Sequence, residues 1–367
     1  MSPSLEIGRA SSGLGEASRV TGKEGCRRLN PLETPEWDKL VLAHPEASFF
    51  HSASWAAVLR DTYRHSPHYF CAMKGERLAA TLPVMEVNSP LTGRRGVSLP
   101  FTDECLCLCD DPVTGQGLFG EAMDFGRKRG WRYLECRGFK NLSEENSPSL
   151  SFYGHVLALA EREDRIFGQF ESSVRRAIRK AENAKIQVEV SQSYESLRTY
   201  YSMHCQTRKK HGLPPQSPSF FSNIFKHVLS QGLGCIVVAS HQSRPVAAAI
   251  FFHFDDKAIY KFGASDEAFQ HLRGNNLVMW EAIKWYAGKG YASLHFGRSS
   301  IGNEGLRRYK LGFGTAEYKI DYFKYDYRKE AFVAERDKVF GWFNGVFRLM
   351  PIALSRMLGR LLYRHLS

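Results

Sequence analysis

Two stretches of the chain share one pattern: residues 121–134 read EAMDFGRKRGWRYL, and residues 281–294 read EAIKWYAGKGYASL. Each begins with Glu-Ala, runs through seven residues to a glycine, and continues with an aromatic residue that opens an apolar run. This period predicts an amphipathic helix, a glycine that ends the helix in the left-handed conformation, and a buried strand. The same local structure is therefore expected twice.

A second parallel lies upstream of each copy. Residues 78–84 (LAATLPV) and 246–252 (VAAAIFF) both follow a polar turn after a hydrophobic segment, which is the pattern of one hairpin found twice. Two matches in the same order favour an internal duplication. We therefore expect an α/β (α+β) chain with two tandem domains, each a mixed central sheet flanked by helices, followed by a helical tail.

The chain divides into five predicted segments, which are a disordered Ser/Gly-rich leader (1–29), an N-terminal domain (30–165), a basic connecting helix (166–184), a C-terminal domain (185–328) and an amphipathic helical tail (329–367). Within the tail, residues 335–367 predict two short helices broken at Pro351. A basic segment with an apolar face suits either peripheral contact with the inner membrane or packing on the second domain, and both interpretations stay open.

Composition limits the classes of function. The 367 residues are 43% hydrophobic, which is enough for two cores. The chain is also basic, with 50 Lys and Arg residues against 38 Asp and Glu residues. A basic surface attracts phosphates, nucleic acid or anionic lipid. There is no CxxC pair, no signal-like apolar start and no apolar run of about 20 residues. We therefore predict a cytoplasmic protein without disulfides or membrane-spanning segments.

Cations gather on one face of the predicted connecting helix. Arg175, Arg176, Arg179 and Lys180 fall within an arc of about 140° at helical spacing. Their mutual repulsion would be relieved by a phosphate-rich ligand, although a solvated helix face is the simpler alternative.

Three further patterns bear on binding. Arg208 and His211 lie three apart on one helical face and could grip a carboxylate or phosphate, or mark a surface turn. Residues 303–314 (NEGLRRYKLGFG) combine glycines with cations, which suits close approach to an anion. Alternating cysteines at 105, 107 and 109 are explained better by a strand in a core than by a metal site, so no metal is expected.

From about residue 47 to residue 325, the order of segments resembles the FemABX peptidyltransferases and their FemAB-like relatives, which have the GNAT acyltransferase fold. The matching pieces are residues 50–55 (FHSASW), 174–182 (VRRAIRKAE), 204–212, 276–282 (NLVMWEA) and 305–314. Similar proteins form a subset associated with bacterial exopolysaccharide and exosortase sorting systems.

The resemblance implies transfer of an acyl or aminoacyl group to a cell-envelope or exopolysaccharide precursor held between two GNAT-like domains. Lys310 would receive the donor and neutralise developing charge, and Asp103 would deprotonate an ammonium acceptor, unless it merely caps a turn. The residues expected to contact substrates are Trp55, Arg176, Arg179, Arg208, His211, Tyr260, Asn276 and Arg307.

The donor stays open between aminoacyl-tRNA and acyl-CoA. A CoA-binding GNAT loop has the pattern Q/R-x-x-G-x-G/A, of which residues 271–276 (HLRGNN) keep one glycine. Relatives that act with tRNA often carry a coiled-coil arm, yet residues 194–234 contain no heptad run. A CoA-dependent N-acetyltransferase and a non-catalytic scaffold of polysaccharide assembly are the alternatives.

Overall fold

The computed structural model describes residues 25–140, 142, 147–159, 161–335 and 343–365. The first half of the chain forms β1 (Arg27–Leu29), α1 (Trp37–Leu42), the 3₁₀ helix η1 (Phe49–His51), α2 (Ala53–Tyr63), β2 (Ser66–Pro67), β3 (Tyr69–Lys74), β4 (Arg77–Leu82), β5 (Met85–Ser89), β6 (Gly93–Val97), β7 (Leu108–Cys109), α3 (Pro112–Arg129), β8 (Tyr133–Arg137) and β9 (Leu150–Ala158).

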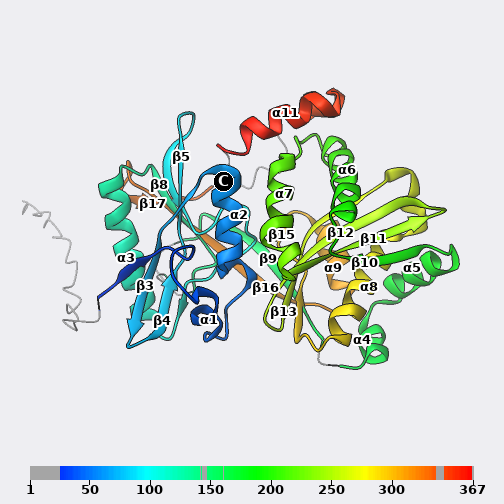
Figure 1. Ribbon diagram of the computed structural model, residues 1–367, viewed down its shortest axis with the longest axis horizontal. Coiled ribbons are helices and arrows are strands. Elements are labelled where there is room, and N and C mark those ends of the chain that lie inside the picture. The colour runs from blue at the N-terminus through cyan, green and yellow to red at the C-terminus, as the bar shows by residue number, and fades with distance from the viewer. Residues whose placement is uncertain (1–24, 141, 143–146, 160, 336–342, 366–367) are drawn as a thin grey trace, which may run out of the picture.

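The second half forms α4 (Glu163–Gln169), α5 (Ser172–Asn183), β10 (Gln187–Ser191), α6 (Tyr194–Lys210), α7 (Pro218–His227), η2 (Leu229–Gln231), β11 (Gly234–His241), β12 (Arg244–Phe254), β13 (Lys257–Ser265), η3 (Glu267–Leu272), α8 (Gly274–Gly288), β14 (Ser293–His295), β15 (Ser299–Ser300), α9 (Glu304–Leu311), β16 (Ala316–Asp326), β17 (Ala331–Phe332), α10 (Phe343–Leu349) and α11 (Ile352–Leu362). Figure 1 shows the two halves side by side, each with helices packed on a sheet.

Both copies of the repeated stretch adopt the predicted structure. The helix α3 ends at Gly130 with a φ of 67°, and β8 follows. The helix α8 is followed by Gly290 with a φ of 79°, and then by β14. The upstream hairpins are β3–β4 and β11–β12. The predicted α/β class, with a mixed sheet flanked by helices in each half, is confirmed.

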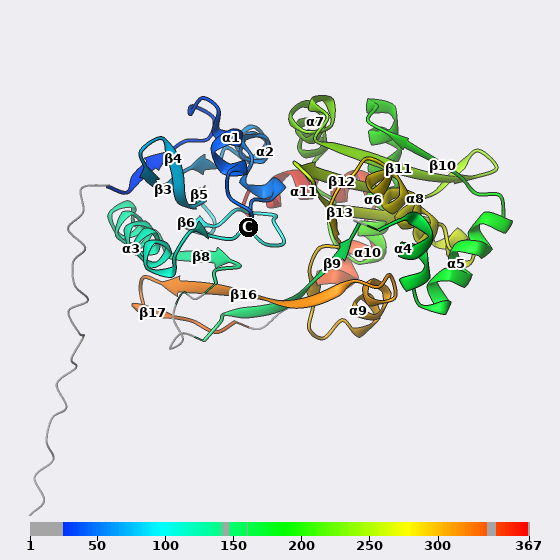
Figure 2. The same cartoon turned by 90° about the horizontal axis from the view of Figure 1, so that it is seen from below.

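One sheet, β1-β3-β4-β7, lies within the first half, whereas the other spans both halves across the predicted boundaries at 165 and 185. Thirteen strands are joined, in the order β10-β11-β12-β13-β14-β9-β16-β8-β6-β5-β2, with β15 on β9 and β17 on β16. The early strand β9 pairs with β14 of the second half, and the late strand β16 pairs with β8 of the first. Figure 2 shows these two long strands running beneath both halves. Each half therefore borrows a strand from the other.

Residues 166–184 are not a connector. They contain the end of α4 and all of α5, and α5 packs on α8 within the second half. Its apolar row, Val174, Ile178 and Ala181, is buried in that half's core. The same periodicity that indicated a packed face therefore marks the first helices of the second domain.

The ends of the chain differ partly from expectation. Residues 27–29 of the predicted leader form β1, which pairs with β3, whereas residues 1–24 lie outside the described part of the chain. The two tail helices are confirmed as α10 and α11, with Pro351 between them. Residues 336–342 and 366–367 are likewise outside the described ranges. Among the described residues, no helix has the length and apolar character needed to cross a membrane.

A candidate active site between the two halves

A cavity of about 300 Å³ opens where the two halves meet. It is called the cleft cavity here. The first half contributes η1 and the loop around residues 103–106, while the second contributes the start of β13 and the strands β14 and β16. The residues that line it are Glu46, Ala47, Ser48, Phe49, Phe50, Asp103, Glu104, Leu106, Lys140, Val156, Lys257, Ala258, Ile259, Ser293, His295 and Tyr318.

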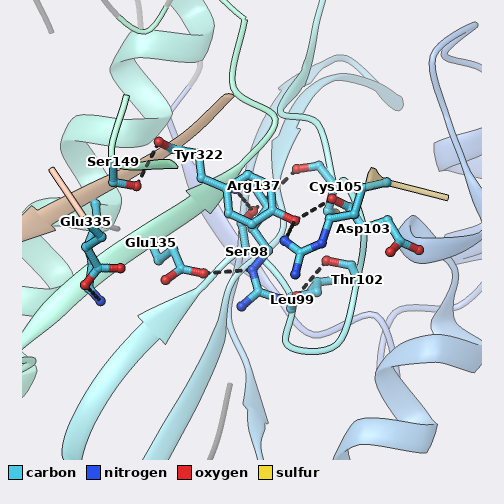
Figure 3. Close-up of polar contacts among 12 residues, drawn as sticks. Ser98, Leu99, Thr102, Asp103, Cys105, Glu135, Arg137, Ser149, Tyr322 and Glu335 are labelled. Carbon is cyan, nitrogen blue, oxygen red and sulfur yellow. Dashed lines mark hydrogen bonds and ion pairs between the residues drawn. The ribbon is translucent and has the colours of Figure 1, made fainter. Parts of the chain in front are cut away.

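The loop that carries Asp103 is held in an unusual conformation. Leu99 and Phe101 have φ values of 39° and 61°, a left-handed region that non-glycine residues seldom occupy and that clusters at functional sites. The Thr102 hydroxyl donates to the Leu99 carbonyl at 2.7 Å. The Tyr322 hydroxyl, from β16, donates to the Asp103 carbonyl at 2.5 Å. Figure 3 shows this network, in which a strand from the far end of the sequence fixes the loop.

Asp103 is an ion-pair partner in this structure. Its carboxylate lies 2.9 Å from the Lys261 ammonium, and the Lys261 side chain is only 6% exposed. Burial acts to raise the pKa of Asp103, but the charges of Lys261 and Arg298 bring that pKa below its ordinary value. A carboxylate so stabilised is a weak proton acceptor, which favours a positioning role over the predicted role of base.

The pKa of the neighbouring residue, Glu104, is shifted in the opposite direction to that of Asp103. The Gly297 N–H donates to His295 Nδ1 at 2.8 Å, which leaves the proton of the neutral ring on Nε2. Nε2 then donates to the Tyr318 hydroxyl at 3.0 Å, and that hydroxyl donates to Glu104 at 2.5 Å. Burial raises the pKa of Glu104 and lowers the pKa of His295 to about 4. Glu104, Tyr318 and His295 thus form a relay at the wall of the cleft cavity.

Two glycines with positive φ lie beside these carboxylates. A Cβ on Gly138, whose φ is 87°, would lie 2.6 Å from Glu104 Cγ. A Cβ on Gly297, whose φ is 71°, would lie 3.7 Å from Asp103 Oδ2. Both residues occupy the left-handed region, so a side chain would strain the backbone at either position and would crowd Glu104 at Gly138.

Lys310 lies behind the cleft cavity rather than in its wall. The side chain is on α9, and the residue is 3% exposed. Its ammonium donates to the Gly297 and Arg298 carbonyls, at 2.8 Å each. Burial lowers the pKa of Lys310 to about 8. Lys310 therefore fixes the segment that abuts Asp103.

A second cavity, of about 540 Å³, lies between α5, α8 and α9. It is called the cationic cavity here. Four exposed cations contribute to its lining: Arg176, Lys180, Arg273 and Arg308. Within the part of the chain that the structure describes, none of these four forms an ion pair. The remaining lining residues are Glu171, Ser173, Val174, Ala177, Asn276, Gly305 and Tyr309.

The N-terminus of α8 opens onto the cationic cavity. Arg273 is the N-cap residue, and no side chain caps the helix there. The first N–H groups of a helix need partners and carry a partial positive charge, which makes such an end suited to an anion. Gly274 lets the helix approach β12, because a Cβ there would lie 3.2 Å from the Ala247 and Val246 side chains. The single glycine of the HLRGNN segment thus serves close packing.

The predicted substrate residues divide between sites. Arg176 and Asn276 line the cationic cavity. Arg179 does not, because it faces a separate surface hollow with Glu182 and stacks over the Phe167 ring at 5.9 Å. Arg176 and Arg179, which were both expected to contact substrates from one basic face, therefore border different hollows.

Two further expectations need correction. Trp55 is 0% exposed within an aromatic cluster that includes Phe50 and Phe220, so it supports the core and reaches no substrate. Arg307 forms a bidentate ion pair with Glu317 at 2.7 Å, so its guanidinium is already satisfied. Its neighbour in sequence, Arg308, is the residue that lines the cationic cavity.

Three more predicted residues lie outside both cavities. The Arg208 guanidinium donates to the Tyr363 hydroxyl at 2.5 Å, and His211 is exposed at the end of α6, so they do not grip one ligand together. Tyr260 is half-buried against Phe251, on the side of β13 away from Lys261, and burial raises its pKa to about 12. Spacing along the sequence could not reveal these contacts, because it does not show which other segments pack against each residue.

Sequence reasoning missed four residues that shape the two cavities. They are Glu104, His295 and Tyr318 of the relay, and Arg273 of the cationic cavity. Glu104 adjoins Asp103, whereas Lys180 and Arg308 belong to basic segments that were recognised without a defined site. His295 and Tyr318 gave no local signal, because their partners come from distant segments. The three cysteines do not share a strand as predicted: Cys105 and Cys107 are buried before β7, whereas Cys109 is half-buried within it.

Comparison with known proteins gives the fold a family context. Residues 168–319 match the family model described as an acetyltransferase (GNAT) domain. Among solved structures, the chain is similar to FemX, with a TM-score of 0.65, 14% identity, and coverage of 83% of this chain and 98% of that one. No curated protein sequence matches the chain.

Two other solved structures have a comparable arrangement. One is the C-terminal domain of a putative lysylphosphatidylglycerol synthetase from Agrobacterium fabrum, with a TM-score of 0.50, 12% identity, and coverage of 78% and 91%. The other is a tandem GNAT protein from the clavulanic acid biosynthesis pathway, with a TM-score of 0.50, 10% identity, and coverage of 82% and 98%. Residues 168–319 therefore match a GNAT domain, within an overall fold like that of FemX and a tandem GNAT protein.

Proposed function

We propose that this chain transfers an acyl or aminoacyl group from a phosphate-bearing donor to an amine-bearing acceptor. The position of α9 between the two cavities carries the proposal. Gly305, Arg308 and Tyr309 line the cationic cavity, whereas Lys310 on the same helix holds the Gly297 segment beside Asp103. A donor anchored on one side of α9 could thus present its carbonyl to an acceptor on the other.

The cationic cavity would hold the phosphate of the donor. Its four cations and an uncapped helix N-terminus converge there, and each favours a doubly or multiply charged anion. Both donors considered above, aminoacyl-tRNA and acyl-CoA, carry phosphates as well as a reactive ester or thioester. The charge pattern supports this class of donor and does not choose between its two members.

The cleft cavity would hold the acceptor amine. Glu104 would take a proton from the acceptor ammonium, with Tyr318 and His295 keeping its carboxylate in place. The free amine would then attack the donor carbonyl, forming a C–N bond. The C–O or C–S bond to the donor would break, and the departing hydroxyl or thiol would take up a proton. Positioning and one proton transfer suffice for this chemistry.

The acceptor that we propose is a cell-envelope or exopolysaccharide precursor met at the cytoplasmic face of the inner membrane. Two observations support it. One structural neighbour is named for lysylphosphatidylglycerol, an aminoacylated lipid. In addition, residues 343–365 contain cationic and apolar side chains suited to peripheral contact with a membrane. The resemblance to the exopolysaccharide-associated subset points to the same location.

Thermal stabilisation tests the donor first. The full chain would be melted with CoA, acetyl-CoA, aminoacyl-tRNA and uncharged tRNA, because a ligand at 100 times its dissociation constant adds about 2.7 kcal/mol. The proposal expects one phosphate-bearing donor to raise the Tm and expects R176Q/R308Q to lose that shift. A shift with acetyl-CoA alone would identify an N-acetyltransferase. No shift with any donor would contradict the transferase and favour the scaffold alternative.

A further inference from the structure

The C-terminal tail is anchored to both halves, and one row of side chains on α11 ties it to the second half. Ser355, Gly359 and Tyr363 recur every four residues and are buried. The Tyr363 hydroxyl accepts from Arg208 at 2.5 Å and donates to the Pro214 carbonyl at 3.0 Å, which ties the helix to the second half. The His365 carbonyl accepts from the Arg95 guanidinium at 2.8 Å, which ties the end of the tail to the first half. Figure 1 shows α11 at the edge of the molecule beside α6 and α7.

A second row on α11 is apolar and exposed. Leu354, Met357 and Leu361 are 43%, 55% and 60% exposed, and at helical spacing they lie roughly opposite the anchored row. In the preceding helix, α10, Leu349 is 87% exposed and Val346 is 52% exposed. The three apolar side chains on α11 lie on one face of that helix, and such a cluster marks an interaction surface rather than ordinary scatter.

A third row is cationic and borders the apolar one. Arg356, Arg360 and Arg364 recur every four residues along one flank of α11, and Arg348 lies on α10. Residues 343–365 contain no Asp or Glu. An exposed apolar stripe beside a purely cationic one complements the headgroup region of an anionic bilayer.

A cavity lies beneath the cationic row. It measures about 340 Å³ and is lined by Arg360 of α11, by Arg364 just after that helix, by Arg64 at the end of α2, and by the first residues of α7. Within the described residues, none of the three arginines forms an ion pair. Tyr63 also lines this cavity, and its hydroxyl is buried without a hydrogen-bond partner in a residue that is 4% exposed. Ser217, which caps α7, and Ser219 complete this part of the lining, and their hydroxyls pair with each other at 2.8 Å.

We propose that the exposed face of residues 343–365 docks on an anionic phospholipid bilayer, with one lipid phosphate received by the cavity of Arg64, Arg360 and Arg364. The apolar row would enter the interface while the arginine row meets the headgroups. This surface lies outside the cleft and cationic cavities, so docking can be tested separately from the transfer reaction. Its anchoring to both halves would fix how the whole protein sits on the membrane.

Vesicle sedimentation with the full chain tests the proposal. Vesicles would be phosphatidylcholine alone, or phosphatidylcholine with phosphatidylglycerol at about a third of the lipid. The wild type should bind only the anionic vesicles, and added salt should weaken binding. R360Q/R364Q should reduce the partition coefficient about 25-fold, since each arginine near an anionic surface contributes about fivefold. The triple variant L354S/M357S/L361S should reduce it more than about tenfold.

Matched control variants distinguish vesicle binding by this face from binding through the overall charge of the protein. R127Q/R165Q removes two exposed arginines from surface ion pairs elsewhere, and Val113→Ser removes an exposed apolar side chain on α3. Both should bind as wild type, and every variant should retain its Tm.

Three results would overturn the proposal. The first is equal binding by wild type and tail variants. The second is a concentration-dependent dimer, abolished by the triple variant, without vesicle binding, which would give this face to a second copy. The third is stabilisation by inorganic phosphate without vesicle binding, which would assign the cavity to a soluble anion.

Discussion

The two repeated helices, α3 and α8, occupy equivalent places in the fold but differ at their N-termini. Asp111 caps α3, with its carboxylate accepting from the Thr114 N–H at 2.8 Å, and Pro112 follows as the first helical residue. Arg273 precedes α8, and no side chain caps that helix. The N-terminus of α3 is therefore capped by a carboxylate, whereas the N-terminus of α8 has no side-chain cap and lies beside four cations. The same helix, glycine and strand can thus serve structure in one copy and anion binding in the other.

In the proposed reaction, the first half contributes at a different place. Its loop at residues 99–104 projects Asp103 and Glu104 into the cleft, where the second half supplies Lys261, His295 and Tyr318. The second copy would then bind the donor, and the first copy would supply the acid groups for the acceptor. Substitutions in each half test that division of roles.

Glu104→Gln should have the strongest consequence. An amide cannot accept the acceptor's proton, so kcat should fall about 10²- to 10⁴-fold with donor affinity unchanged. Because burial raises the pKa of Glu104 above the ordinary 4.5, the wild-type rate should rise with pH through that raised pKa, and the variant should lack this limb. Rate profiles against pH, with donor titrations, check both. A kcat within about threefold of wild type would remove Glu104 from the reaction.

Lys310→Met should change how stability depends on pH. The folded-state pKa of about 8 lies below the ordinary 10.5, so between these values the unfolded chain binds more protons. The free energy of unfolding of the wild type, relative to the variant, should therefore rise by up to about 3 kcal/mol across that window.

Denaturant unfolding of both proteins at several pH values measures this difference. Parallel pH profiles would show that Lys310 keeps its ordinary pKa, and would contradict the buried, positioning role given to its ammonium.

The double variant R176Q/R308Q should weaken donor binding about 100-fold, at about tenfold for each charge-assisted hydrogen bond removed. Arg179→Gln is the matched control, because Arg179 is on the same helix but faces another hollow. Isothermal titration with the donor identified by thermal stabilisation measures both. Equal losses of affinity in the two proteins would mean that binding follows net charge rather than the cationic cavity.

A modest effect is expected at the other helix start. Asp111→Ala removes the cap of α3 and should lower the free energy of unfolding by about 1 kcal/mol. Donor affinity should stay unchanged, because that helix faces no cationic cavity. Urea unfolding and the same titration provide the measurements. Weaker donor binding here would contradict the division between the two copies.

Much of the fold could be predicted because its signals are local. Gly130 and Gly290 end their helices at the predicted positions, and Pro351 separates the two tail helices. The basic row of α5 was also visible, and Arg176 and Lys180 do line a cavity. Helical period, glycine conformation and proline geometry depend on neighbours within a few residues, so they can be read from one segment at a time.

The site could be predicted only in part. Asp103 was found as a residue at a strand end, but its ion pair with Lys261 makes the adjacent Glu104 the better proton acceptor. Arg307 and Arg308 are indistinguishable as letters in a basic segment. Only the antiparallel run of β16 brings Glu317 to Arg307 and leaves Arg308 to the cavity.

The amino-acid sequence alone was enough to specify the helices, turns and strands of two similar units, together with a basic, apolar tail. Tertiary structure was needed to establish that β9 and β16 cross between the halves, that Trp55 is buried, and that Glu104, His295 and Tyr318 meet at one wall. The two kinds of feature differ in the range of the forces behind them. Backbone preferences act over a few residues, whereas the pairing of strands and the burial of charges depend on which distant segments the shared sheet brings together.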